Sequence, residues 1–223
     1  MEPILLFFVS LLHIIAINLL LSGDNAVVVA MASRNLPPHK RKWAIWWGTV
    51  GAVVLRILLS LIVVWLFHIP FIMLAGGVLL TWIAFKLLVQ EASDAEVSAA
   101  NSLWQAIQTI ILADMVMSMD NVLAVAAAAK GDLLLLALGI AISIPIIIWG
   151  STFILYLLGR FPWLLFVGGG ILAWTAGEII VRDEFVLNLL AQRPGYAQVV
   201  PIAATLAILI AGWSYNGMKR RFG

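Results

Sequence analysis

Acidic and amide side chains occur at matched positions inside two long apolar segments of the chain. Asp24-Asn25 lies in the first segment and Asp120-Asn121 in the second, each two residues after a serine. Carboxylate and carboxamide oxygens are the ligands that hard divalent cations such as Mg, Ca and Mn prefer, whereas Zn and Cu favour imidazole and thiolate groups. The chain has no cysteine. These pairs therefore predict a site for a hard divalent cation.

Helical geometry adds two residues to this predicted site. At about 100° per residue, Asn18 shares a helix face with Asn25, and Asp114 shares one with Asn121. A carboxylate inside a membrane costs about 2.5–3.5 kcal/mol on insertion scales, so it usually faces a cavity or a partner. An alternative is that the Asp-Asn pairs only cap a helix break. The predicted metal ligands are Asp24, Asn25, Asp120, Asn121, Asp114 and Asn18.

Three further charged residues lie within apolar segments. Arg56 is too deep to reach the surface easily, so we expect it to pair with an intramembrane acid or carbonyl group and to take part in gating or coupling. Lys86 and Glu178 each lie about a turn from a predicted helix end. One interpretation is that these long side chains extend to the membrane surface. The other is that they take part in gating or coupling.

The composition requires a membrane. Of 223 residues, 64% are hydrophobic and 11% are charged, whereas soluble domains carry about half apolar and a quarter charged residues. A soluble enzyme is therefore excluded. The basic clusters at Lys40-Arg41-Lys42 and Lys219-Arg220-Arg221 flank apolar segments, which is typical of topology signals and not of nucleic-acid binding. The chain has no GxxxxGK or HExxH sequence, which argues against an ATPase or a membrane metalloprotease.

A spanning helix needs about 20 mainly apolar residues. The basic residues between the predicted spans favour an outside N-terminus and a cytoplasmic C-terminus, in what we expect to be a bacterial inner (plasma) membrane. The predicted spans are about 4–32, 44–67, 71–90, 103–129, 133–158, 163–181 and 198–217.

The chain contains an internal repeat. The Ser-x-Asp-Asn motif recurs at an offset of 96 residues, and Pro70, Gly76-Gly77 and Trp82 recur at an offset of 92. Since each repeat holds three spans, the second copy enters the membrane from the opposite face, as in secondary transporters. We therefore predict an all-α integral membrane fold in one transmembrane domain, 1–223, with inverted repeats at about 4–90 and 103–182 and an extra helix at about 198–217.

The residues Ser22-Gly23-Asp24-Asn25-Ala26 and Met119-Asp120-Asn121-Val122 carry a resemblance. On a seven-helix chain of this length, they resemble the TerC family of integral membrane proteins, within the LysE-like transporter superfamily. The resemblance covers nearly the whole chain. It implies a role in metal-ion homeostasis, especially manganese export, and metal-site roles for the Asp and Asn of both pairs. The second copy departs from the first at Met119, which stands where the first has Gly23.

The leading hypothesis is a secondary transporter that exports a divalent cation, manganese above all, with no permanently bound cofactor. The expected partners are the lipid bilayer and the metal substrate, with a homo-oligomer as an option and no nucleic acid. Two alternatives stay open. One is export of amino acids or small metabolites, and the other is a membrane partner protein that assists metal loading of exported enzymes.

Overall fold

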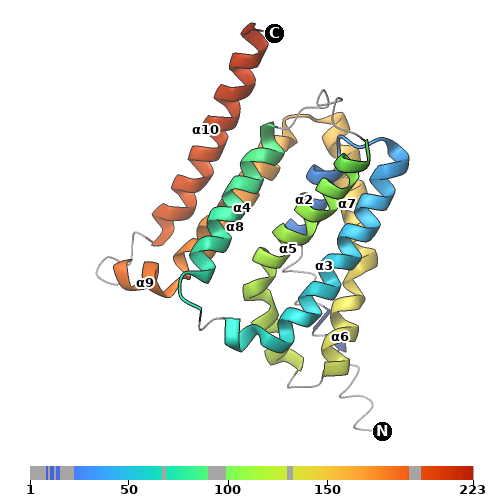
Figure 1. The fold of residues 1–223 in the computed structure, drawn as a ribbon, viewed down its shortest axis with the longest axis vertical. Coiled ribbons are helices and arrows are strands. Elements are labelled where there is room, and N and C mark those ends of the chain that lie inside the picture. Colours follow the sequence, from blue (N-terminus) through green and yellow to red (C-terminus); the bar gives the residue numbers. More distant parts are fainter. Residues whose placement is uncertain are drawn as a thin grey trace. The chain divides into compact units, whose positions relative to one another are not determined.

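The structure is a computed structural model that describes residues 9, 11–12, 14–15, 23–66, 69–89, 99–129, 133–190 and 197–222. The described chain is all-α (Figure 1). Four stretches are long and apolar enough to cross a membrane, namely Pro38–Ile62, Ile72–Val89, Ala137–Arg160 and Leu164–Val181, and two shorter helices are also apolar. The helices are α2 (Gly23–Ser33), α3 (Pro38–Leu66), α4 (Ile72–Val89), α5 (Ala99–Ala129), α6 (Leu133–Ala141), α7 (Ser143–Arg160), α8 (Leu164–Val181), α9 (Glu184–Leu190) and α10 (Val199–Phe222).

Most predicted spans correspond to observed helices, with shifted ends. Helix α3 begins at Pro38 and so includes the basic cluster that the sequence analysis placed before the span. Proline fits this first position, because its missing N–H would be unpaired there in any case. Much of the predicted span 4–32 lies outside the described residues. The short helix α9 was not predicted, because its seven residues fall in a segment that was read as a connection.

The predicted span 133–158 is interrupted at Ile142, between α6 and α7. Pro145 lies just after the interruption. A proline inside a helix removes one backbone donor and its ring clashes with the carbonyl four residues earlier, here that of Ala141. The Ser143 hydroxyl donates a hydrogen bond of 2.5 Å to the Ile140 carbonyl oxygen at the same place. A single apolar run thus forms two helices with a polar turn between them.

The chain divides into two compact units. Unit 1 comprises residues 1–66 and 103–155, and unit 2 comprises residues 67–102 and 156–223. Unit 1 therefore contains the first two spans of each predicted repeat, including both Asp-Asn motifs. Unit 2 contains the third span of each repeat together with α10. Each unit is described by itself below.

In unit 1, α3 presents two chemically different faces. Thr49, Ala52, Val53 and Arg56 follow one another at helical spacing and are all buried. Val54, Leu58 and Leu61, on another side, are each about half exposed. Polar groups inside and apolar groups outside are what a lipid-facing helix with an internal site requires. Close packing on α5 is possible because Gly48 and Gly51 have no side chain: a Cβ on either would come within 2.7 Å of an isoleucine on α5.

In unit 2, α4 and α8 pack against each other in antiparallel directions, and α10 contacts both. Glycines at the matched repeat positions form this contact. A Cβ on Gly77 would overlap Ile180, and a Cβ on Gly169 would touch Leu88 at 3.4 Å. Gly169 is the repeat equivalent of Gly77, and Ile180 is the repeat equivalent of Leu88, each 92 residues later in the chain. The two glycine contacts are therefore reciprocal, which is the pattern of an approximate two-fold axis.

The buried carboxylate of Asp183 joins two helix starts in unit 2. Its Oδ2 accepts a hydrogen bond of 3.0 Å from the Leu74 backbone N–H in the first turn of α4. Its Oδ1 accepts one of 3.1 Å from the Phe185 N–H in the first turn of α9. The first turn of a helix has N–H groups without intrahelical acceptors, and a carboxylate there satisfies them and interacts well with the helix dipole. Asp183 therefore ties the end of α8 to the start of α4.

Candidate functional site

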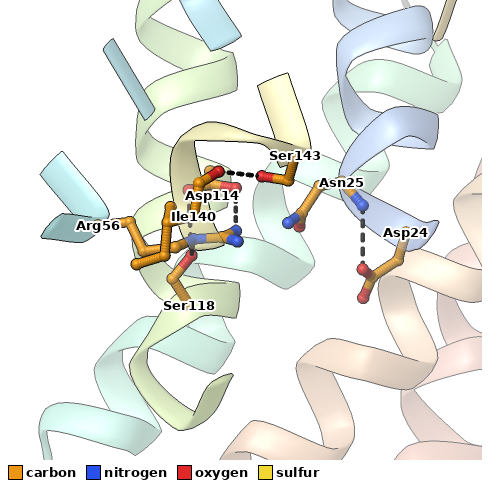
Figure 2. Close-up of polar contacts among 7 residues, drawn as sticks. All are labelled: Asp24, Asn25, Arg56, Asp114, Ser118, Ile140 and Ser143. Atoms are coloured by element: carbon orange, nitrogen blue, oxygen red, sulfur yellow. Dashed lines mark hydrogen bonds and ion pairs between the residues drawn. The ribbon is translucent and has the colours of Figure 1, made fainter. Parts of the chain in front are cut away.

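Three side chains from two helices of unit 1 form a buried polar network (Figure 2). The Arg56 guanidinium of α3 donates through Nη2 to Asp114 Oδ1 on α5 at 2.6 Å, and through Nε to Ser118 Oγ at 2.8 Å. The Ser118 hydroxyl donates to Asp114 Oδ2 at 3.0 Å. Arg56 is only 1% exposed and Asp114 only 7%. The network confirms the prediction that Arg56 pairs with an intramembrane acid.

The spacing of the residues along α5 explains how the network assembles. Asp114 and Ser118 are four residues apart, so they lie on the same helix face one turn from each other. A buried charge is tolerated when it is paired and its remaining hydrogen-bonding groups are satisfied. Both oxygens of the Asp114 carboxylate accept hydrogen bonds here, one from Arg56 and one from Ser118.

A small cavity of about 10 Å³ lies next to Asp114, between α2, α3, α5 and α7. This is close to the space that one water molecule needs. Its walls combine apolar side chains with the polar groups of Asn25, Thr49 and Asp114. Asn25 is 3% exposed and Thr49 is 1% exposed. Among the described residues, the Asn25 amide nitrogen, the Asn25 amide oxygen and the Thr49 hydroxyl have no hydrogen-bond partner.

These unpartnered groups are unusual, because the large majority of buried side-chain polar atoms in proteins have a partner. Leaving such a group unsatisfied costs about 1–3 kcal/mol. Figure 2 shows the Asn25 amide pointing toward Asp114. The Asp24 carboxylate instead accepts a hydrogen bond of 3.0 Å from the Asn25 backbone N–H. The cavity thus offers an amide, a hydroxyl and a carboxylate that together suit a small cation or a water molecule.

The interruption between α6 and α7 lies beside this cluster. Figure 2 shows Ser143 and the Ile140 carbonyl near Asp114 and Asn25. Ser143 is 3% exposed. An interrupted helix inside the membrane is tolerated where it is buried in protein or lines a cavity. Ile147, one turn after Ser143 on α7, forms part of the cavity wall.

The structure brings together some of the predicted site residues. Asn25 and Asp114 line one cavity, and Arg56 contacts Asp114. Asn121 lies two turns after Asp114 on α5 and is partly buried. Asn18 and the side chain of Asp120 lie outside the described residues. Among the side chains that the structure does describe, no three His, Asp or Glu groups are close enough to hold a metal ion.

Lys86 and Glu178 belong to unit 2, not to the unit that contains Asp114. Lys86 Nζ lies 5.2 Å from the centre of the Trp82 ring, within the range of a cation–π interaction. Glu178 is exposed on α8. These environments fit the surface reading of both residues, and their gating or coupling role stays a prediction.

Three polar residues of the cluster were absent from the predicted site, namely Thr49, Ser118 and Ser143. Ser118 was visible as the serine of the second Asp-Asn motif. Thr49 carries a weaker signal, since it lies seven residues before Arg56 and therefore on the same face of α3. Hydroxyl residues such as Thr81 and Thr152 instead bond to their own helix backbone, so residue type alone does not mark a site.

Comparisons with known proteins agree over nearly the whole chain. The family model described as "Integral membrane protein TerC family" matches residues 5–221. The chain is 42% identical to the uncharacterized membrane protein YjbE of Bacillus subtilis, covering 96% of this chain and 98% of that protein. It is 25% identical to the uncharacterized membrane protein YkoY of the same organism, covering 95% of this chain and 73% of that protein. No solved structure matches the chain.

Proposed function

Since the chain belongs to the TerC family of integral membrane proteins, we propose that it is a secondary-type transporter that exports a divalent metal cation, with manganese as the first choice. The observation that carries the proposal is the buried cavity where the unpartnered Asn25 amide and Thr49 hydroxyl meet the Asp114 carboxylate. Oxygen ligands of these kinds suit Mg, Ca and Mn. A transport role, and not an enzymatic one, follows from a polar cavity enclosed by apolar membrane helices.

We place Asp24, Asp120 and Asn121 in the same transport path. Asp24 lies beside Asn25 at the start of α2, and Asn121 lies two turns from Asp114 on α5. A conformational change that repositions these motifs would bring more oxygen ligands to the cation, as alternating access requires. Asn18 enters the proposal through helical geometry, and Asp120 enters it through the Asp-Asn motif of the sequence.

The inverted-repeat plan, seven spans and an outside N-terminus belong to the same proposal. Support comes from unit 2, where the repeat-related helices α4 and α8 are antiparallel and contact each other through matched glycines. Corresponding helices of an inverted repeat run in opposite directions through the membrane.

The cavity disfavours the metabolite alternative. A space of about 10 Å³ is far smaller than an amino acid needs. An amino acid would therefore have to widen the cavity. A metal ion needs much less space.

The test is metal flux into liposomes that contain the purified full-length protein. We expect flux of Mn²⁺ in the wild type and loss of most of it in Asn25→Leu and in Asp114→Asn. The exposed residues Asn188 and Glu184 provide matched controls, since Asn188→Leu and Glu184→Gln make the same chemical changes outside the cavity. Absence of flux for Mn²⁺, Ca²⁺ and Mg²⁺ under every ion gradient would favour a partner role over transport. Full flux in both cavity variants would contradict this site.

A further inference from the structure

The Arg56 side chain binds the Asp114 carboxylate, which the proposed cation also needs. Asp114 Oδ1 lies 2.6 Å from Arg56 Nη2, and Asp114 Oδ2 accepts the Ser118 hydroxyl, which itself accepts from Arg56 Nε. A cation that binds Asp114 must therefore replace or share the guanidinium.

Charge decides which ions can replace it. The attraction between two charges scales with their product, so a divalent ion at a given distance is attracted to Asp114 twice as strongly as a monovalent one. A monovalent ion gains no charge advantage over the resident guanidinium. A divalent ion loses more hydration on entering a space of about 10 Å³, but it gains the second charge and finds oxygen ligands at Asn25 and Thr49 that replace part of its hydration shell.

We infer that Arg56 is a specificity-determining residue that excludes monovalent cations from the Asp114 site and admits divalent ones. The inference rests on the proposed function, because it assumes that Asp114 belongs to the cation site. Arg56 acts here as a tethered competitor: only an ion with a higher charge displaces it from the carboxylate. Without Arg56, Asp114 would be an uncompensated carboxylate that Na⁺ or K⁺ could neutralise.

The experiment measures Mn²⁺ binding to the purified full-length protein by calorimetry, in Na⁺ and in N-methylglucamine at equal ionic strength. We expect the wild-type Kd to be the same in both salts. In Arg56→Gln, we expect Na⁺ to raise the Kd for Mn²⁺ by about tenfold, within the usual range for coupled sites. Arg160→Gln is the matched control, because it removes an arginine charge at an exposed position of α7 and should behave as the wild type.

If Arg56→Gln does not fold, Arg56→Lys tests the same proposal. Lysine retains the charge but has no planar fork that could bond both Asp114 and Ser118. We expect this variant to remain insensitive to Na⁺ and to bind Mn²⁺ more tightly than the wild type, since lysine is easier to displace. An unchanged Kd in Arg56→Lys, or insensitivity to Na⁺ in a folded Arg56→Gln, would overturn the role of Arg56. Absence of Mn²⁺ binding in the wild type would instead overturn the proposed function.

Discussion

At the scale of single residues, the site combines one satisfied group and two unsatisfied ones. Asp114 has partners on both oxygens, whereas the Asn25 amide and the Thr49 hydroxyl have none in the part of the chain that the structure describes. Buried polar groups without partners are destabilising. A cluster that served only to stabilise the fold would therefore gain nothing from leaving the Asn25 amide and the Thr49 hydroxyl unsatisfied. This imbalance supports the proposal that the cluster binds a cation.

Replacement of the Thr49 hydroxyl separates stability from function. Thr49→Val keeps the shape of the side chain and removes a hydroxyl that bonds to no described residue. We therefore expect thermal stability to stay the same or increase, while Mn²⁺ affinity falls about tenfold, as for loss of a group that supports a metal site. Tryptophan fluorescence on heating and calorimetry measure the two effects.

Thr152→Val is the control for this change, because Thr152 is exposed and its hydroxyl bonds to the Ile148 carbonyl of its own helix. It should leave Mn²⁺ affinity unaltered. Lower stability of Thr49→Val with unaltered affinity would mean that the hydroxyl is a structural group.

The sequence reveals charged site residues better than neutral ones. Asp114 and Arg56 stand out because a charge in an apolar segment needs a partner. Thr49 does not stand out, because threonine is common in membrane helices and usually bonds to its own backbone. Lys86 and Glu178 illustrate a different limit: the repeat aligns their positions, but Lys86 lies over the Trp82 ring and Glu178 is exposed on α8, so their surroundings differ.

At the scale of helices, the glycines of unit 2 have unequal roles despite their matched positions. A Cβ on Gly77 would come within 2.7 Å of the Ala176 carbonyl oxygen, which belongs to the backbone and cannot easily move. A Cβ on Gly169 would meet the Leu88 side chain at 3.4 Å, which is an ordinary van der Waals contact. The approximate symmetry between α4 and α8 is therefore tighter at one contact than at the other.

Alanine substitutions test this difference directly. We expect Gly77→Ala to destabilise the protein by about 1–3 kcal/mol through overpacking, and Gly169→Ala to have little effect. The measurement is the temperature at which each variant loses its monodisperse peak in size-exclusion chromatography. Equal losses in the two variants would show that the α4–α8 contact does not have the described geometry.

Helix positions were predictable from apolar run length, but interruptions were not. The run 133–158 is continuous in hydrophobicity, and Pro145 alone does not decide between a kinked helix and two helices, since membrane helices tolerate proline. The interruption is one residue long: the Ile142 N–H still donates to the Leu138 carbonyl, and the buried Ser143 hydroxyl donates to the Ile140 carbonyl. The burial of Ser143 depends on packing between helices and has no local sequence signal.

At the scale of the whole molecule, charge distribution predicts the orientation in the membrane. The cytoplasmic assignment of the connection between α2 and α3 depends on its basic residues. Burial lowers the pKa of Arg34 to about 10. This value is still well above neutral pH, so Arg34 remains charged and contributes to the positive side as the orientation rule requires.

The absence of cysteine makes this orientation easy to test. His39→Cys and Glu184→Cys each introduce one thiol at an exposed position, in the basic start of α3 and at the start of α9. We expect a membrane-impermeant maleimide to label Glu184→Cys in intact cells and to label His39→Cys only after the membrane is opened. The reverse pattern would contradict the proposed orientation.

The hydrogen bond between Asp183 and Leu74 also determines when one part of the fold can form during synthesis. The Leu74 N–H and its acceptor on Asp183 are separated by 109 residues. At about 5–20 residues per second, the ribosome needs about 5–20 seconds to reach the acceptor after it has made the donor. During that interval the start of α4 depends on interfacial water or lipid head groups to satisfy this donor. The α4–α8 pair therefore completes only late in biogenesis, after the whole of unit 1 has been translated.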